Sequence, residues 1–265
     1  MKKIDKLKTI LKELKHVVVA YSGGLDSTFL LKTAIDTLGR DNVIAVTARS
    51  ETYPYSEYRQ ARQIARRIGA RHLTIGTSEL ELPGFAANPV NRCYYCKKEL
   101  FKKLNRIKER YGMDFVADGT NFDDLKDIRH GRKAAKELGV KSPLLAAKIG
   151  KKDIRKFSRE LGLATWDKPS SACLASRFPF YNRITKAGLA RISKAEDCLK
   201  KLGFRQVRVR LHGDIARIEL LKKDLRKAVK LGDAITGKMK KCGFIYATLD
   251  LVGYRTGSMH EITKS

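Results

Sequence analysis

The chain has 265 residues, and 43% of them are hydrophobic, which is enough to bury a core and excludes a largely disordered protein. Lysine and arginine number 56 against 28 aspartates and glutamates, so the formal net charge of +28 favours a polyanionic partner such as nucleic acid, a nucleotide or a phosphorylated substrate. No apolar run approaches the roughly 18 residues that span a membrane, and five cysteines without an export signal favour a reducing compartment, so we expect a cytoplasmic protein.

The first part of the chain alternates apolar strands with amphipathic helices. The first fifteen residues have helical spacing of apolar side chains among lysines. Further helices are predicted at residues 29–39, 58–68, 95–111 and around 154–161, and strands at 16–21, 42–48, 72–75 and 115–117. Strands that are apolar almost throughout, separated by such helices, predict a parallel sheet covered on both faces. We therefore expect a doubly wound α/β domain over residues 1–169.

The pattern changes near Trp166-Asp-Lys-Pro169. Residues 170–182 have no regular period, a helix is predicted at 189–202, and alternating strands follow at 207–211 and 215–220. A helix near 224–230 and a strand at 244–249 complete the chain. This order predicts a smaller α+β domain over residues 170–265, with Cys173 in the connecting segment.

The segment Ser22-Gly-Gly-Leu-Asp-Ser-Thr28 lies between the first strand and the following helix. Its two glycines let the backbone approach an anion closely, and the helix behind them offers free N–H groups and the positive end of its dipole. Ser22, Ser27 and Thr28 add hydroxyl donors, and Asp26 is a candidate magnesium ligand. An ordinary strand-to-helix turn is the plain alternative, but the strand–loop–helix context favours a phosphate site.

A second glycine-containing segment, Gly232-Asp-Ala-Ile-Thr-Gly-Lys238, has the spacing of a Walker loop. Met239 stands where that loop needs a magnesium-binding hydroxyl, and the segment follows a predicted helix rather than a strand. We therefore do not expect a nucleotide site there.

Three cysteines are candidate ligands. Cys93 and Cys96 form a CxxC pair at the start of a helix, and Cys173 lies in the irregular segment, whereas Cys198 and Cys242 are expected to be packing residues. One CxxC pair is too few for a four-ligand zinc site, and two incidental thiols remain an alternative. Together the three cysteines can bind three irons of a 4Fe–4S cluster and leave the fourth iron open.

The Ser-Gly-Gly-x-Asp-Ser pattern resembles the pyrophosphate loop of the PP-loop ATP pyrophosphatases. These enzymes cleave ATP between the α and β phosphates and adenylate a carbonyl or carboxylate oxygen. The resemblance implies that the leaving pyrophosphate is held by Ser22, Gly23, Gly24, Asp26 and Ser27. Asp118-Gly-Thr-Asn121, at the end of the fourth strand, resembles the second nucleotide motif of these enzymes, which implies ATP contacts from Gly119 and Asn121.

A set of further motifs, in order along nearly the whole chain, resembles the LarE family, the ATP-dependent sulfur transferases of nickel-pincer nucleotide synthesis. The motifs are Asn91-Arg-Cys-Tyr-Tyr-Cys-Lys97, Trp166-Asp-Lys-Pro169, Ala172-Cys-Leu-Ala-Ser-Arg177, Val207-Arg-Val-Arg210, Ala216-Arg-Ile-Glu219 and Asp250-Leu-Val-Gly-Tyr-Arg-Thr-Gly-Ser-Met259. One departure is Arg129-His130-Gly131, where Arg-Pro-Gly is expected, and we expect it to alter a turn rather than the chemistry.

The resemblance implies the chemistry: ATP adenylates the carboxylate of a pyridinium mononucleotide, and a sulfur nucleophile displaces AMP to give a thiocarboxylate. In one version, the cysteine matching Cys173 gives up its own sulfur and becomes dehydroalanine. In a second version, three cysteines hold a cluster whose open iron carries an added sulfide. Because Cys93, Cys96 and Cys173 are all present, we favour the cluster, with Lys97 stabilising charge near the adenylate.

The resemblance also assigns roles in the second domain. Arg208 and Arg210 alternate along one strand and share a face, which suits a phosphate; a solvated basic face is the alternative, and the resemblance implies the phosphate of the substrate. Glu196 and Glu219 match acidic positions linked with divalent metal in the family, although from the sequence alone they are expected on the surface. A homo-oligomer built through the small domain is also implied.

Two other functions remain open. Related PP-loop enzymes thiolate tRNA, and the net charge of +28 favours such a partner. A non-catalytic RNA-binding protein that keeps the loop as a phosphate contact is the other, but it leaves the three cysteines without a role. Release of AMP and pyrophosphate separates an enzyme from a binder.

Overall fold

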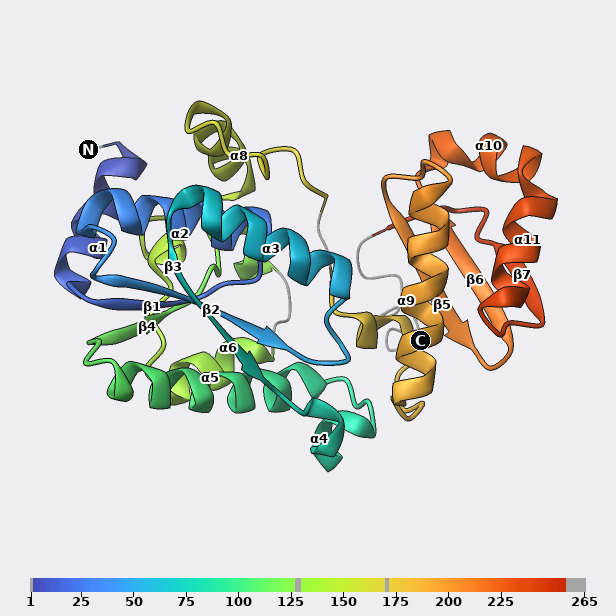
Figure 1. The fold of residues 1–265 in the computed structure, drawn as a ribbon, viewed down its shortest axis with the longest axis horizontal. Helices are drawn as coiled ribbons and strands as arrows, with labels where there is room; N and C mark the ends of the chain where they lie inside the picture. The colour runs from blue at the N-terminus through green and yellow to red at the C-terminus, as the bar shows by residue number, and fades with distance from the viewer. Residues whose placement is uncertain (1, 127–129, 170–171, 256–265) are drawn as a thin grey trace. The chain divides into compact units, whose positions relative to one another are not determined.

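The computed structural model describes residues 2–126, 130–169 and 172–255, and the chain divides into two compact units (Figure 1). Unit 1 comprises Met1–Glu79 and Asn91–Ser171, and unit 2 comprises Leu80–Val90 and Ala172–Ser265. The sequence placed residues 80–90 in the first domain. In the structure this segment pairs with unit 2, because the Ile184 N–H donates to the Ala86 carbonyl and Asn88 Nδ2 donates to the Pro179 carbonyl, 2.9 and 2.6 Å away. Such distant pairing leaves no periodic pattern in the sequence.

Unit 1 is built on a four-stranded sheet in which every strand pair is parallel, as predicted. The strands are β1 (Val17–Ala20), β2 (Val43–Arg49), β3 (Arg71–Gly76) and β4 (Phe115–Ala117), in the order β3-β2-β1-β4. Val17 is in register with Val43 on one side and Phe115 on the other. Both neighbours of β1 therefore run parallel to it, so their carboxyl ends reach the same edge of the sheet.

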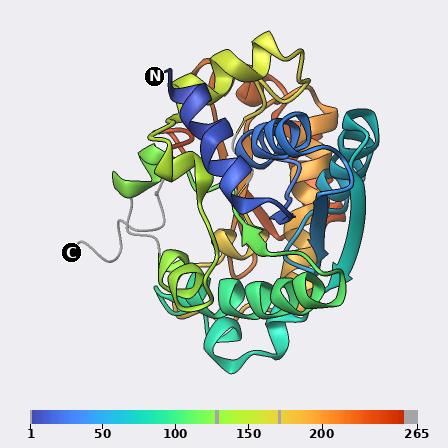
Figure 2. The same ribbon diagram turned by 90° about the vertical axis from the view of Figure 1, so that its left-hand side faces the viewer.

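Alternate residues of the sheet enter two different cores. Val17 and Val19 pack into the core under helices α1 (Lys3–Leu14) and α2 (Leu25–Leu38), whereas Val18 enters the core under α5 (Arg92–Arg110). Figures 1 and 2 show α1 and α2 on one face of the sheet and α5 with α6 (Gly131–Glu137) on the other. The central strands β1 and β2 are apolar and buried on both faces, whereas β3 at the edge of the sheet is partly exposed; helices on both faces of a parallel sheet confirm the doubly wound α/β fold.

The remaining elements of unit 1 include α3 (Tyr55–Ile68), α7 (Pro143–Ala146), α8 (Lys151–Glu160) and the short 3₁₀ turn η2 (Phe122–Lys126). A second 3₁₀ turn, η1 (Glu79–Glu81), spans the boundary between Glu79 of unit 1 and Leu80 of unit 2. The sequence predicted the long helices but not α6 or α7, which are seven and four residues long. Helices this short carry less than two turns of apolar periodicity.

Unit 2 is the predicted α+β unit. Strands β5 (Val207–His212) and β6 (Ile215–Leu220) pair antiparallel, and β7 (Tyr246–Leu249) adds parallel to β6. Helices α9 (Lys186–Lys201), α10 (Leu225–Lys230) and α11 (Gly232–Lys241) share an apolar core with this sheet, and the unit also contains α4 (Pro83–Ala86), η3 (Leu174–Arg177) and η4 (Lys222–Asp224). Thr185 caps α9 by accepting the Gly188 N–H.

The Walker-like segment is helix α11, which the sequence did not predict because its two glycines lower helix propensity. Met239 is fully buried in the core of unit 2, so the side chain that replaces the required hydroxyl serves packing. In the described part of the chain, no helix has the length and apolarity needed to cross a membrane.

Candidate functional site

The phosphate loop, residues Ser22–Thr28, lies at the topological switch point of the sheet. From β1 the chain moves to β2 and β3 on one side, while β4 lies on the other side of β1. In an open parallel sheet, a crevice forms at the carboxyl ends of the strands where the order reverses. The phosphate loop follows β1 and the Asp118–Asn121 motif follows β4, so both flank this point.

Gly23 fixes the course of the phosphate loop. Its φ is +63°, and a Cβ built on it would lie 2.5 Å from the Ala61 Cβ and 2.8 Å from the Ala61 Cα. Any other residue is therefore excluded both by conformation and by the backbone of α3. The backbone can approach a phosphate here because it carries no side chain.

The serines of the loop close it into a ring. Ser27 Oγ lies 3.1 Å from Ser22 Oγ and accepts the Ser22 N–H at 3.2 Å, and the Tyr53 hydroxyl donates to the Ser22 carbonyl at 2.6 Å. Gly24 caps α2 without a side-chain bond, so the first N–H groups of the helix point along the axis toward the loop. This is the arrangement expected of a phosphate cradle.

The tyrosines beside the loop are neutral donors. Burial raises the pKa of Tyr21 to about 12, and burial together with the negative charge of Glu57 raises the pKa of Tyr53 further. The Tyr53 hydroxyl therefore keeps its proton at neutral pH and can hold the Ser22 carbonyl.

Two lysines that the sequence did not assign lie at the loop. Lys151, the first residue of α8, forms an ion pair with Asp26, and Lys168 donates to the Gly23 carbonyl at 3.0 Å and pairs with Glu57 at 2.9 Å. Lys168 belongs to the Trp166–Pro169 motif, for which the sequence alone predicts no role. Only contacts across the fold, 125 and 145 residues apart in sequence, identify these lysines.

The motif after β4 contacts the phosphate loop directly. A Cβ on Gly119 would lie 3.1 Å from the Ser27 N, so the glycine lets the two segments touch. Asp118 is held in place because it accepts the hydroxyls of Thr120 and Ser142, each at 2.7 Å. Asn121 is fully buried and bonds Asp123 and Asp124 within the turn, so it orders the motif from inside.

A basic pocket of about 510 Å³ opens next to this motif. Its cationic side chains come from α6 and the segment after it, and its floor is apolar; the lining residues are Thr120, Arg132, Lys133, Ala135, Lys136, Val140, Lys141, Ser142 and Leu145. Among the described residues, four cations and no carboxylate line the pocket, so their field favours an anion.

The residues at the loop fit a magnesium ion bound with a nucleotide. Magnesium is commonly held by one or two carboxylates together with phosphate oxygens and water, and Asp26 offers one carboxylate in the first turn of α2. Because Lys151 already pairs with Asp26, the lysine is also in position to balance the charge of a phosphate.

Cys93 and Cys96 lie in the first turns of α5, in unit 1. Cys93 is exposed and Cys96 half-buried, and their spacing of three residues places them on one helix face. Lys97 extends over the Phe101 ring, with its Nζ 5.4 Å from the ring centroid. Arg129 of the departing tripeptide lies outside the described residues, while Gly131 approaches Lys97 so closely that a Cβ there would lie 2.9 Å from the Lys97 Cγ.

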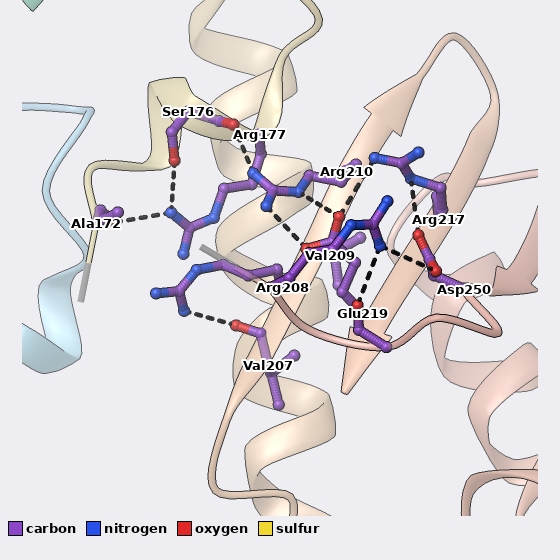
Figure 3. Close-up of polar contacts among 12 residues, drawn as sticks. Ala172, Ser176, Arg177, Val207, Arg208, Val209, Arg210, Arg217, Glu219 and Asp250 are labelled. Atoms are coloured by element: carbon purple, nitrogen blue, oxygen red, sulfur yellow. Dashed lines mark hydrogen bonds and ion pairs between the residues drawn. The ribbon is translucent and has the colours of Figure 1, made fainter. Parts of the chain in front are cut away.

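Cys173 belongs to unit 2 and precedes η3; we call Cys173 and η3 together the Cys173 turn. The cysteine is exposed, but Arg177 at the end of the turn is only 1% exposed. Arg177 Nη1 lies 2.8 Å from the Ala172 carbonyl and 2.9 Å from Ser176 Oγ (Figure 3). It also lies 3.0 Å from the Cys173 carbonyl. The backbone that carries the thiol is thus fixed from inside the unit.

Two buried glutamates hold the arginines of this region. Glu196 binds Arg177 through both of its oxygens, at 2.8 and 3.0 Å, and Glu219 binds Arg210 in the same way, at 3.0 and 2.8 Å. These glutamates are 2% and 0% exposed, so the prediction of surface glutamates is wrong. A divalent metal at either one has to displace a buried guanidinium.

Arg208 and Arg210 share a strand face, but their partners differ. Arg210 Nη1 donates to the Ser176 carbonyl at 2.7 Å in addition to its pair with Glu219 (Figure 3). Arg208 lies over the Tyr254 ring at 5.3 Å, and burial and the nearby charge of Arg177 lower its pKa to about 10. It is still protonated at neutral pH, so it keeps its charge for an anion.

Among the residues that the structure describes, no three His, Cys, Asp or Glu side chains gather closely enough to hold a metal ion. The thiols themselves suit iron, since they are soft ligands and none is in a disulfide.

Comparison with known proteins agrees with this geometry. Residues 2–86 match the family model described as NAD synthase, which covers the phosphate loop. The chain is 41% identical over 256 residues to the pyridinium-3,5-bisthiocarboxylic acid mononucleotide synthase of Lactiplantibacillus plantarum, covering 96% of this chain and 93% of that protein.

Two uncharacterized proteins are similar over the same length. One from Synechocystis sp. is 42% identical over 98% of this chain and 97% of its own, and one from Methanocaldococcus jannaschii is 35% identical over 97% and 98%. The end-to-end match to the mononucleotide synthase, with the phosphate loop at the switch point of the sheet, establishes that the chain belongs to the LarE family of ATP-dependent sulfur transferases, in the PP-loop superfamily.

Proposed function

We propose that this chain uses ATP to adenylate a carboxylate of pyridinium-3,5-biscarboxylate mononucleotide and replaces the AMP by sulfur, giving a thiocarboxylate for nickel-pincer cofactor synthesis. The observation that carries the proposal is the 41% identity to a protein named for this product over 96% of the chain. The phosphate loop and the exposed Cys173 supply the two chemical functions that the reaction requires.

The first half-reaction uses unit 1. A carboxylate oxygen of the substrate attacks the α-phosphorus, the bond to the β-phosphate oxygen breaks, and pyrophosphate leaves. The leaving pyrophosphate is held by the phosphate loop, through Ser22, Gly23, Gly24, Asp26 and Ser27. The rest of the ATP molecule is positioned by Gly119 and Asn121. Lys151 and Lys168, placed at the loop by their contacts with Asp26 and the Gly23 carbonyl, offset the negative charge that develops on the leaving group. Bound magnesium would supply further charge neutralisation on the phosphates.

The second half-reaction needs a sulfur nucleophile that attacks the activated carbonyl carbon and expels AMP. We assign Cys93, Cys96 and Cys173 to a 4Fe–4S cluster, which when bound would offer an added sulfide at its open iron. Lys97, directly after Cys96 in the sequence, stabilises negative charge near the adenylate. Arg208 is assigned to the phosphate of the substrate, with Arg210 beside it, since Arg208 is charged and lies on the strand face next to the Cys173 turn.

A variant of the same function needs no cluster. Cys173 attacks the adenylate with its own sulfur, and elimination then leaves dehydroalanine in the chain. The Ser176 hydroxyl and Arg177 Nη1 both donate to the Cys173 carbonyl. These donors favour the variant without a cluster, because they stabilise negative charge on that oxygen during the elimination. A homo-oligomer built through unit 2 is also part of the proposal.

A tRNA thiolase is the second candidate, favoured by the net charge of +28 and the basic pocket. The two candidates differ in substrate only, so they share the same AMP-forming step. Purified protein is therefore incubated with ATP and either the mononucleotide or unmodified tRNA, and AMP, pyrophosphate and thiolated product are measured. Thiolated product that forms from tRNA but not from the mononucleotide would refute the proposed substrate.

The sulfur source is tested in the same preparation. Iron and acid-labile sulfide are measured on anaerobically purified protein, for the wild type and for Cys93→Ala, Cys96→Ala and Cys173→Ala. About four irons per chain, lost in each variant, is the result expected of the cluster. Protein that stays free of iron after anaerobic reconstitution excludes it, and a mass loss of hydrogen sulfide at Cys173 after one turnover then indicates the cluster-free variant.

A further inference from the structure

The carbonyl oxygen of Cys173 has an unusual number of donors. It accepts the Ser176 N–H at 3.0 Å and the Ser176 hydroxyl at 2.8 Å, and Arg177 Nη1 lies 3.0 Å away. A carbonyl oxygen has two lone pairs, and an ordinary helical carbonyl accepts one N–H. Three donors, one of them cationic, form the surroundings of an oxygen that carries negative charge.

These donors are held rigidly. Arg177 is 1% exposed, and its Nε and Nη2 are bound by the two oxygens of Glu196, which leaves Nη1 directed at the Cys173 turn. Glu196 in turn accepts the Val209 N–H of β5 at 3.1 Å, so the chain of contacts ends in the sheet. Glu196 is thus a positioning residue, since it acts on the Cys173 turn through the guanidinium that it fixes.

We propose that Arg177 and Ser176 form an oxyanion site for the carbonyl of Cys173 itself, which promotes β-elimination of sulfur from that cysteine. A base removes the Cα proton of S-substituted Cys173, and the electron pair first develops as an enolate whose charge lies on the carbonyl oxygen. The Cβ–S bond then breaks, the sulfur leaves with its electron pair as the thiocarboxylate, and dehydroalanine remains in the chain. Donors that are already in place stabilise the enolate without reorganisation.

The proposal rests on the proposed sulfur transfer in its cluster-free variant, but its physical core is separate from ATP and substrate. It concerns only how readily a proton leaves the Cα of Cys173. It can therefore be tested with a chemical leaving group on sulfur in place of the thiocarboxylate.

The probe is 2,5-dibromohexanediamide, applied to full-length protein that a chelator has freed of iron. The reagent alkylates a thiol twice, releasing two bromides, and the resulting sulfonium leaves as a neutral cyclic thioether when base removes the Cα proton. Mass spectrometry of the Cys173 and Cys93 peptides follows alkylated and dehydroalanine forms separately, so exposure of the thiol does not enter the elimination rate. Cys93 is also exposed and serves as the internal reference.

In the wild type, we expect the alkylated Cys173 to eliminate its sulfur at least roughly tenfold faster than the alkylated Cys93. This is a conservative value, because a single oxyanion donor commonly contributes more to a rate. Ser176→Ala, which removes the hydroxyl donor, should reduce this advantage. Arg177→Lys should remove most of it, because lysine keeps the charge beside Glu196 but not the second nitrogen that reaches the carbonyl. Arg191→Lys is the matched control, since Arg191, on α9, also donates to a backbone carbonyl, that of Gly243, but lies outside the Cys173 turn.

Equal rates at Cys173 and Cys93 in the wild type overturn the proposal, and that comparison needs no variant to fold. An advantage that survives both Ser176→Ala and Arg177→Lys also overturns it. The AMP assay separates this result from the proposed function: fast elimination without AMP release on the mononucleotide refutes the function alone, and AMP release without fast elimination refutes the inference alone.

Discussion

The two units position their functional groups by opposite means. The phosphate loop of unit 1 is shaped by backbone: a glycine at φ +63°, a helix N-terminus and a second glycine that touches Ser27. The Cys173 turn of unit 2 is shaped by buried side-chain charges, Arg177 with Glu196 and Arg210 with Glu219. A backbone site fails when a side chain is added, and a buried-charge site fails when one charge is removed.

The largest effect is expected at Glu196, where Gln removes one charge of a pair whose side chains are 1% and 3% exposed. Breaking a buried pair leaves an uncompensated charge and costs about 3–5 kcal/mol. Urea unfolding should show this loss as a lower free energy of unfolding of unit 2. Asp197→Asn, the next position along the same helix and half-exposed, is the control, since a surface pair contributes at most about 1 kcal/mol. Similar losses in the two variants would contradict the role of burial.

The same glutamate predicts a pH dependence. Burial alone raises the pKa of Glu196, but the charge of Arg177 and the hydrogen bonds from Arg177 and the Val209 N–H outweigh it, so its pKa is lowered from 4.5. Its stabilisation is therefore complete above pH 4.5 and is lost as the pH falls through the lowered value. Acid titration of stability should be shallower in Glu196→Gln than in the wild type. Parallel curves would show that Glu196 does not titrate as inferred.

The next effect is on the backbone site. Gly23→Ala places a Cβ 2.5 Å from Ala61 in a conformation that alanine rarely adopts, so we expect AMP formation to fall by about 100-fold, the effect of misplacing a reacting group by about 1 Å. Gly39→Ala is the control, because Gly39 also has positive φ, +86°, but nothing within 4 Å. It should lose stability without losing the rate. Equal rates in both variants would show that the shape of the loop does not limit the reaction.

This difference also explains what the sequence predicts. Gly23, Gly24 and Gly119 lie in short contiguous motifs next to buried strands, so local pattern reveals both the sheet and the phosphate loop. Arg177 and Glu196 are 19 residues apart, and Arg210 reaches Ser176 across 34, so no window of sequence connects them. Charged residues are assumed to be exposed, and that assumption led to the error at Glu196 and Glu219. Lys151 and Lys168 could not be assigned to the phosphate loop either, because a single lysine in a lysine-rich chain has no sequence signal of its own.

The buried cysteine of unit 2 gives a reference for thiol reactivity. Burial and the neighbouring thiol of Cys198 raise the pKa of Cys242 from 9.0 to about 11. Since the thiolate is the nucleophile, this rise lowers the thiolate fraction of Cys242 at neutral pH to about one hundredth of that of an ordinary thiol. Timed alkylation with iodoacetamide, followed by peptide mass spectrometry, should show the exposed Cys93 and Cys173 modified first and Cys242 last. Early modification of Cys242 would contradict its burial in the core.

The smallest effect is expected at Lys151, because its pair with Asp26 is 41% and 22% exposed and is therefore screened by solvent. Lys151→Met removes a cation from the phosphate loop but leaves the backbone cradle intact, so kcat/KM for ATP should fall by about tenfold, or about 1.4 kcal/mol. The loss should shrink as salt is added, which a change in backbone shape would not do. Lys32→Met is the matched control, since Lys32 also pairs with an aspartate of α2, Asp36, two turns beyond the loop. If Lys151→Met matches Lys32→Met, the loop holds its phosphates by backbone alone, and the contrast between the two units is sharper than the ion pair suggests.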